Sequence, residues 1–174
     1  MADDDPLFIP FRFHVSFARE AIGAHGSDQG QQGNEPLADG GFAEVTGLEA
    51  SMEPRSIREG GLNHVVHQRS GPVQFSTVVL RRGLTRARDL WQWWALIAGA
   101  SSGGADDRPP GGAFAYRLTV RIRLADIDGS PAFVWRLDRA LPIKFKTADL
   151  NARAAEIGVE ELHLVHEGLH LEGV

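Results

Sequence analysis

The sequence predicts a mainly β protein: an antiparallel β-barrel or sandwich of about six to seven strands with one flanking α-helix. Short segments alternate apolar and polar residues with a period of two, and clusters of turn-forming residues separate them. Only one segment has helical periodicity, and the strand–helix–strand order of a parallel sheet does not occur. With 174 residues, 43% of them hydrophobic and 24% charged, the chain is expected to form one domain over residues 1–174.

The first expected strand covers residues 11–17, in which Phe11, Phe13, Val15 and Phe17 alternate with polar residues. A period of two places one face of a strand on the core and the other face toward water or a neighbouring molecule. Further strands are expected at residues 41–48, 73–80, 116–124, 132–137, 142–145 and 155–171.

Residues 86–98 form the only convincing helix, with Thr85 as the expected N-cap and Gly99 at the end. Trp93 lies at the margin of its apolar stripe and is a candidate for a subunit interface. A ligand-binding β module that stacks its ligand on Trp93 and Trp94 is an alternative function. The stripe itself is expected to pack on the sheet and comprises Leu90, Trp91, Trp94, Ile97 and Ala98.

Two segments rich in glycine and polar residues, 24–40 and 99–113, are expected to be flexible loops. Between them, residues 48–72 are expected to form an extended arm, a long hairpin that turns at Gly60 and Gly61.

Composition excludes several kinds of chemistry. The chain has no cysteine, which rules out disulfides, thiolate metal ligands and cysteine nucleophiles. Its formal net charge of −5 argues against a surface that grips nucleic acid. The acidic start at residues 1–6 lacks the layout of a signal peptide, so synthesis in the cytoplasm is expected. No apolar run is long enough to span a bilayer, so no membrane contact is expected in the resting state.

Three arginines, Arg117, Arg121 and Arg123, alternate along one face of a single expected strand. A solvated outer face explains them, and so does a pore lining or contact with an acidic neighbour.

The C-terminal pattern His166-Glu167-Gly168-Leu169-His170 matches H-E-x-x-H and raises the alternative of a zinc-dependent hydrolase. That chemistry needs a helix, which brings two histidines four residues apart onto the same metal ion. Alternating polarity around the pattern instead predicts a strand, in which the histidines lie about 13 Å apart. No residues are therefore assigned as catalytic, metal-binding or cofactor-binding.

The order of several segments resembles the tail tube proteins of contractile phages and phage-like contractile injection systems. These segments are FRFHVSF, GFAEVTGLEASMEPRSIREGG with Asn63 beyond it, LRRGLT, LWQWW, RIRLADIDGSPAFVWRLDRALPIKF, DLNA and IGVEELHLVHEGL. They run from about residue 11 to residue 169, nearly the whole chain.

The resemblance implies an inner tube subunit that forms homohexameric rings, which stack into a conduit for DNA or protein cargo. It also implies a sheath protein, baseplate or tube-initiator proteins, and a cargo or tape-measure protein in the lumen as partners, with no cofactor. The arm is expected to bridge neighbouring subunits, and its mixed charges suit polar contacts. The subunit-interface candidates are Glu53, Arg55, Arg58, Glu59, Gly60, Gly61, Asn63 and Trp93.

Overall fold

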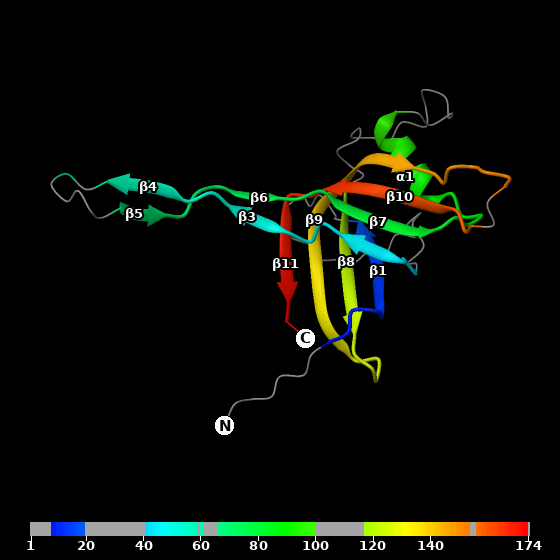
Figure 1. The fold of residues 1–174 in the computed structure, drawn as a ribbon, viewed down its shortest axis with the longest axis horizontal. Helices are drawn as coiled ribbons and strands as arrows, with labels where there is room; N and C mark the ends of the chain where they lie inside the picture. The colour runs from blue at the N-terminus through cyan, green and yellow to red at the C-terminus, as the bar shows by residue number, and fades with distance from the viewer. Residues whose placement is uncertain are drawn as a thin grey trace, which may run out of the picture.

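Antiparallel strands and a single helix make up the computed structural model, which describes residues 8–19, 41–58, 60, 66–99, 117–153 and 156–173 (Figure 1). The predicted loop at 24–40, and all of the one at 99–113 except Gly99, lie outside these residues. The elements in chain order are β1 (Phe13–Arg19), β2 (Glu44–Thr46), β3 (Ala50–Met52), β4 (Arg55–Arg58), β5 (Val66–Arg69), β6 (Val73–Phe75), β7 (Val78–Gly83), α1 (Asp89–Ala98), β8 (Leu118–Ala125), β9 (Pro131–Lys146), β10 (Val159–Val165) and β11 (Gly168–Glu172). The predicted fold class is confirmed.

Seven strands form one antiparallel sheet in the order β1-β8-β9-β10-β7-β2, with β11 also paired to β9. β9 divides this sheet into two halves. Residues 131–140 pair with β8, and residues 134–138 also pair with β11, whereas residues 141–146 pair with β10. We call β1, β8, β11 and residues 131–140 the first half, and β2, β7, β10 and residues 141–146 the second half.

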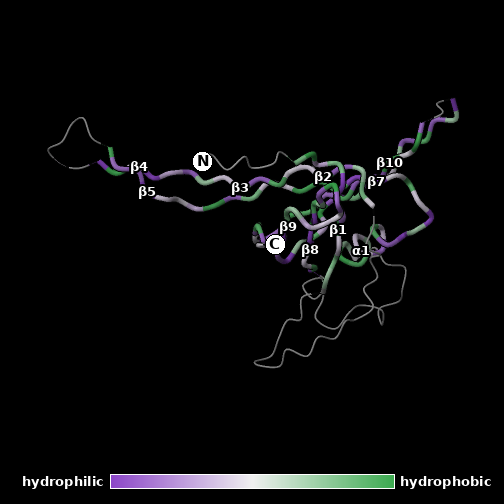
Figure 2. Tube along the Cα trace, turned by 90° about the horizontal axis from the view of Figure 1, so that it is seen from below, coloured by the Kyte–Doolittle hydropathy of each residue, from purple (hydrophilic) through white to green (hydrophobic). Residues whose placement is uncertain are grey.

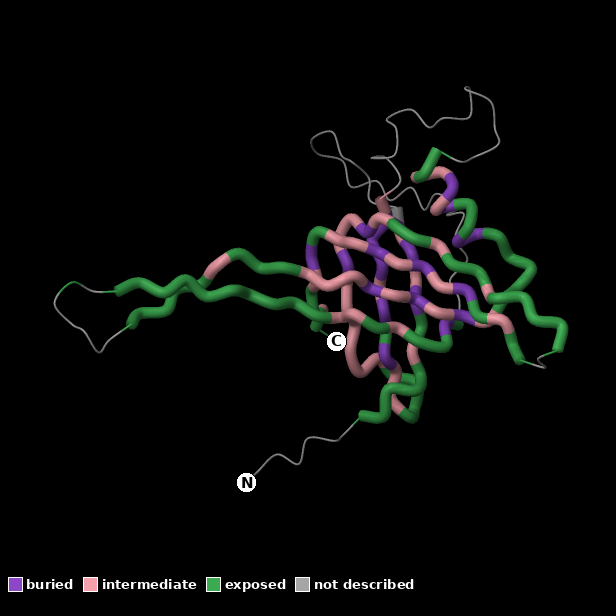
Figure 3. The backbone as a smooth tube through the Cα atoms, turned by 45° about the horizontal axis from the view of Figure 1, so that its top comes forward, coloured by how far each residue is buried: buried purple, intermediate pink, exposed green. Residues whose placement is uncertain are grey.

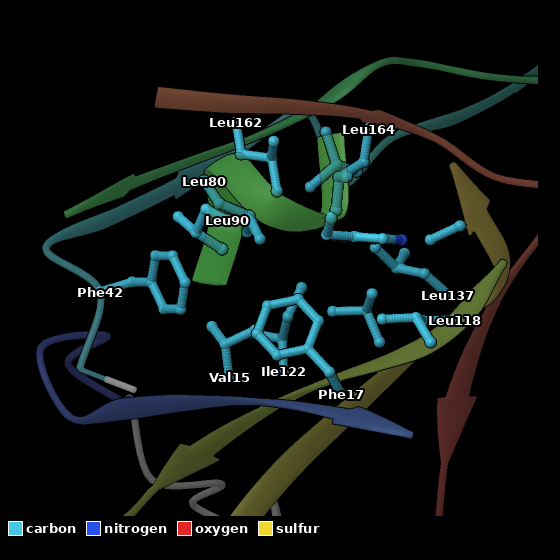
Figure 4. Close-up of a cluster of buried hydrophobic side chains, with 14 residues drawn as sticks. Val15, Phe17, Phe42, Leu80, Leu90, Leu118, Ile122, Leu137, Leu162 and Leu164 are labelled. Carbon is cyan, nitrogen blue, oxygen red and sulfur yellow. The ribbon is translucent and has the colours of Figure 1, made fainter. Parts of the chain in front are cut away.

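The hydrophobic core lies between the two halves (Figure 4). Val15 and Phe17 of β1 face it from the first half, while Leu80 and Leu162 face it from the second half. The alternation that predicted the strands explains this arrangement, because every second residue of each strand points inward. On β8, for example, the core-facing residues are Leu118, Val120, Ile122 and Leu124, all at most 5% exposed.

The helix begins later than predicted, at Asp89 instead of residue 86. The hydroxyl of Thr85 accepts a hydrogen bond from the amide of Ala87 at 3.2 Å, so Thr85 closes a turn that precedes the helix. Gly99 ends the helix as predicted, with φ of +69°.

Three expected strand boundaries were wrong, in each case because a strand changes its pairing partner. The expected strand 73–80 is interrupted between β6 and β7, where the chain leaves the arm. The expected strands 132–137 and 142–145 are one continuous strand, β9. The expected strand 155–171 is two strands, β10 and β11, which pair with different parts of β9.

Candidate assembly surfaces

A two-stranded arm projects from the body of the molecule (Figures 1 and 3). It consists of two short hairpin sections, in which β3 pairs with β6 and β4 pairs with β5. At its base the amide of Ser76 donates to the carbonyl of Glu49 at 3.1 Å. Residues 50–58 and 66–70 are all exposed, so the arm makes almost no contact with its own body.

Two glycines allow the backbone to follow the course of the arm. Gly47, between β2 and β3, has φ of +85°, and a Cβ there would lie 2.1 Å from the carbonyl oxygen of Thr77. Gly71 lies between β5 and β6, and a Cβ there would lie 1.9 Å from the carbonyl oxygen of Glu53. At both glycines, two backbone segments lie so close together that no side chain fits between them.

Most of the predicted interface residues that the structure describes lie on this arm. Glu53, Arg55, Arg58 and Gly60 are all exposed there. Glu59, Gly61 and Asn63 lie outside the described residues. Whether the arm residues contact another subunit stays a prediction, since the structure contains one chain.

Hydrophilic and hydrophobic residues are mixed along the arm (Figure 2). Over residues 48–72 its charges balance, with three arginines (Arg55, Arg58 and Arg69) and three glutamates (Glu49, Glu53 and Glu59). Arg55 lies directly opposite Arg69 in the hairpin, and Arg58 lies opposite Val66. None of these three arginines forms an ion pair with another described residue. The exposed apolar residues are Met52, Ile57, Val66 and Val73, at 41–54% exposure.

Trp93 is not at a margin, and that prediction was wrong. It is 2% exposed, and its ring meets the ring of Phe17 edge-on at 6.0 Å in the core. Trp91 is instead the exposed tryptophan of the helix, at 44%. It packs on Trp94 at 5.1 Å and on Phe145 at 5.5 Å. Burial of Trp93 also removes it as a platform for a stacked ligand.

The outer face of the first half of the sheet carries a network of charges. Arg136 of β9 contacts Asp138 at 2.8 Å and Glu172 of β11 at 2.9 Å. Arg121 of β8 reaches the same Glu172 at 3.3 Å. The hydrogen bond from Arg136 to Asp138 raises the pKa of the Arg136 guanidinium. The predicted alternation on β8 thus places its arginines on the face opposite the core.

The C-terminal H-E-x-x-H pattern does not form a helix. His166 and Glu167 lie at the bend between β10 and β11, and His170 lies in β11. The carboxylate of Glu167 pairs with Arg117 and Arg139, and His170 lies 2.9 Å from Asp138. The helical geometry that a zinc site of this type requires is therefore absent.

His166 is partly buried and packs against an aromatic ring. Its ring packs on the ring of Phe75 at 5.1 Å, where the arm joins the body. Burial lowers the pKa of His166 below its ordinary value, which favours the neutral imidazole. Among the described residues, no group of three or more histidine, aspartate or glutamate side chains is placed to hold a metal ion.

Both edges of the first half of the sheet lack a partner strand in the part of the chain that the structure describes. Within the described residues, β1 pairs only with β8 and β11 pairs only with β9. An unpaired strand edge presents amides and carbonyls that can pair with another chain. None of the described helices is long and apolar enough to cross a membrane.

Comparison with solved structures shows the same fold in three components of contractile assemblies. A protein of the anti-feeding prophage baseplate is 23% identical, with a TM-score of 0.70 and 97% of each chain covered. A protein of an extracellular contractile injection system sheath–tube complex in the extended state is 20% identical, with a TM-score of 0.67 over 99% of this chain and 95% of the other. A protein of the anti-feeding prophage tube-terminating cap is 17% identical, with a TM-score of 0.68 over 99% of this chain and 97% of the other.

The comparison with curated proteins gave no match. A family model described as T4-like virus tail tube protein gp19 matches residues 9–170. This match spans nearly the whole chain, including the arm, the helix and the C-terminal strands. The chain belongs to the T4-like virus tail tube protein gp19 family.

Proposed function

We propose that this tail tube protein closes into homohexameric rings, which stack into the inner tube of a contractile tail or injection system. The observation that carries the proposal is the four-stranded first half of the sheet, whose outer strands β1 and β11 each have one edge with no partner strand among the described residues. Pairing of β11 in one copy with β1 in the next would extend the sheet from copy to copy. Six copies would give a closed barrel that has no remaining edge.

In such a ring, the charged face of the first half lines the channel, because the opposite face is covered by the core of each subunit. The channel wall then carries Arg121, Arg136, Asp138 and Glu172 as linked pairs of opposite sign. Charges that are paired with one another bind a passing polymer weakly. This property suits a conduit for DNA or protein cargo, and for a tape-measure protein during assembly.

The proposed role is mechanical and steric, and it requires no catalytic site or cofactor. A sheath protein, baseplate or tube-initiator proteins and cargo are the proposed partners. The assemblies in which the structural relatives were solved, a baseplate, a sheath–tube complex and a cap, support this set. The protein is thus proposed to act as a component of an assembled particle.

Native mass spectrometry combined with hydrogen exchange tests the proposal. The expected assembly has a mass of about 114 kDa, six times the 19.0 kDa chain. As this species forms, the outward amides of β1 and β11 should gain protection from exchange. β7 pairs with strands on both sides and serves as the internal reference. Ring formation without added protection in β1 and β11 would contradict the proposed edge pairing.

A further inference from the structure

An open cleft of about 440 Å³ lies where β1 begins, beside the turn between β8 and β9 (Figure 1). Its lining residues are Arg12, Phe13, His14, Arg123, Ala125 and Gly129. Three of these side chains are basic, and no carboxylate of the described chain is among them. The cleft is many times larger than the roughly 30 Å³ that a water molecule occupies, so a small anion can enter it with part of its hydration.

The pairing of β1 with β8 brings the basic side chains together. His14 lies directly opposite Arg123 in this pairing. Arg12 lies two residues before His14, and its side chain reaches the turn between β8 and β9. The strand neighbours Val15 and Ile122 are at most 2% exposed in the core. Because side chains alternate along a strand, His14 and Arg123 project from the opposite face, where they are exposed.

Contacts with the backbone orient the two guanidinium groups. Nη1 of Arg12 donates to the carbonyl of Ile127 at 2.8 Å, and Nη2 of Arg123 donates to the carbonyl of Gly129 at 3.4 Å. A guanidinium has five N–H groups, so most of them remain for a ligand. Neither arginine forms an ion pair with another described residue, and neither does His14.

Two carboxylates lie in the same turn, and their charges balance those of the two arginines. Each carboxylate is engaged by the turn itself. Oδ1 of Asp126 accepts a hydrogen bond from the amide of Ile127 at 2.6 Å. Oδ1 of Asp128 accepts from the amide and the hydroxyl of Ser130, at 2.8 and 2.6 Å. The cleft therefore attracts an anion through directed N–H groups, and not through an excess of positive charge.

A phosphate group matches these donors. Arginine binds phosphate through two parallel, charge-assisted hydrogen bonds. Donors from three side chains suit a group with at least three free oxygens, whereas a carboxylate offers only two. We propose that the cleft binds one such phosphate group, held by Arg12 and Arg123 with His14 as a further donor. Inorganic phosphate and the terminal phosphate of a nucleotide share this chemistry.

A phosphate in the cleft would connect the start of β1 to β8 and its turn. β1 is an outer strand of the first half of the sheet, and its free edge is the one proposed to pair with the next copy. A ligand that binds only the folded chain stabilises it by mass action. Phosphate should therefore strengthen this edge for assembly. That consequence rests on the proposed function, whereas the binding itself is a property of the single chain.

Isothermal titration calorimetry with inorganic phosphate, at a fixed ionic strength, tests the proposal. One saturable site per chain is expected. Arg12→Gln and Arg123→Gln should each weaken binding at least about tenfold, because each removes charge-assisted contacts. The two residues lie in different segments, so a folding defect in one variant leaves the other as a test.

Arg86→Gln is the matched control. Arg86 is exposed, forms no ion pair with another described residue and does not line the cleft. This variant should bind phosphate as the unmodified protein does. No saturable binding to the unmodified protein, or equal binding by the Arg12, Arg123 and Arg86 variants, would overturn the proposal.

Two further ligands test the selectivity of the cleft. Acetate should bind at least about tenfold more weakly than phosphate, and equal binding of the two would overturn the assignment of phosphate. A nucleoside monophosphate that binds as tightly as phosphate would support a nucleotide as the natural ligand. Weaker binding of the nucleotide than of phosphate would support the free ion.

Native mass spectrometry of the same samples separates this inference from the proposed function. Phosphate binding without rings would support the cleft and contradict ring closure. Rings whose subunits bind no phosphate would overturn the inference and leave the ring proposal standing.

Discussion

Arg82 of β7 and Asp89 in the first turn of α1 form a two-point salt bridge that is almost closed to water. The distance from Nη1 of Arg82 to Oδ2 of Asp89 is 3.1 Å, and Nη2 contacts Oδ1. The Nε of the same guanidinium contacts Glu160 of β10. Burial acts to lower the pKa of Arg82, but the hydrogen bonds to Asp89 and Glu160 more than offset it, so the pKa is raised. One cation therefore connects the helix to two strands.

Arg82→Ala should strongly destabilise the fold, because it leaves two carboxylates buried without a counter-charge. The expected loss in the free energy of unfolding is about 3–5 kcal/mol, measured by urea denaturation. Arg82→Lys should fall between this variant and the original protein, since an ammonium group cannot make the two-point contact.

Arg81→Ala is the matched control for this comparison. Arg81 is the neighbouring residue on β7 and also contacts two carboxylates, Glu44 and Glu161, but on a face that is partly open to water. Its removal should cost less than about 1 kcal/mol. Equal losses for the Arg81 and Arg82 variants would show that burial does not determine the strength of these contacts.

Gly47→Ala should disturb the base of the arm. The backbone at Gly47 has φ of +85°, and the added Cβ would meet the carbonyl oxygen of Thr77. Strain and steric overlap together should lower the free energy of unfolding by about 2–4 kcal/mol. Gly129→Ala is the control, because Gly129 has φ of +87° with no atom near the added Cβ, and should cost about 1–2 kcal/mol. Thermal unfolding of both variants measures the difference, and equal effects would contradict the close approach at Thr77.

Trp93→Ala should cost more stability than Trp91→Ala. Trp93 is 2% exposed in the core, so its truncation leaves a large cavity and should cost about 3–5 kcal/mol. Trp91 is 44% exposed, and its truncation should cost less than about 2 kcal/mol. Urea denaturation compares the two variants. A larger loss of stability for Trp91→Ala than for Trp93→Ala would contradict the burial of Trp93 in the core.

His166 should make the stability of the protein depend on pH. Burial lowers its pKa in the folded state from the ordinary value of 6.5. As the pH falls below about 6.5, the unfolded chain binds a proton that the folded chain does not, so stability decreases. The loss continues until the pH reaches the lower, folded-state pKa.

His166→Gln should reduce this dependence, because residue 166 then takes up no proton in either state. Tm measured between about pH 7.5 and pH 5.5 should fall less steeply than in the unmodified protein. An identical slope in the His166 variant and the unmodified protein would contradict the role of burial.

The sequence predicted the fold class because it depends on local patterns. Alternation marks strands, and Gly60 with its neighbour marks a turn, whatever else the chain contacts. The expected strand 73–80 ended before Arg82, although Val78, Leu80 and Arg82 share the period of a core-facing strand. Glu160, the partner of Arg82, was not predictable, because it lies 78 residues away and is brought there by the pairing of β7 with β10.

The position of Trp93 was missed for a similar reason. Three tryptophans within four residues allow more than one apolar stripe on the same helix. The core contact with Phe17 of β1 selects the stripe that contains Leu90 and Trp93. The split of the C-terminal strand also depends on tertiary pairing, since β10 and β11 have different partners within β9.

Cryo-electron microscopy of the purified protein tests directly whether the subunits form rings through β1 and β11. Sixfold rings and stacked tubes are expected, in which the charged face containing Arg121 and Arg136 lines the channel. β11 of each subunit should pair with β1 of the next, and each arm should lie on a neighbouring copy. Dispersed monomers at every concentration, or rings whose channel is lined by another surface, would contradict this arrangement.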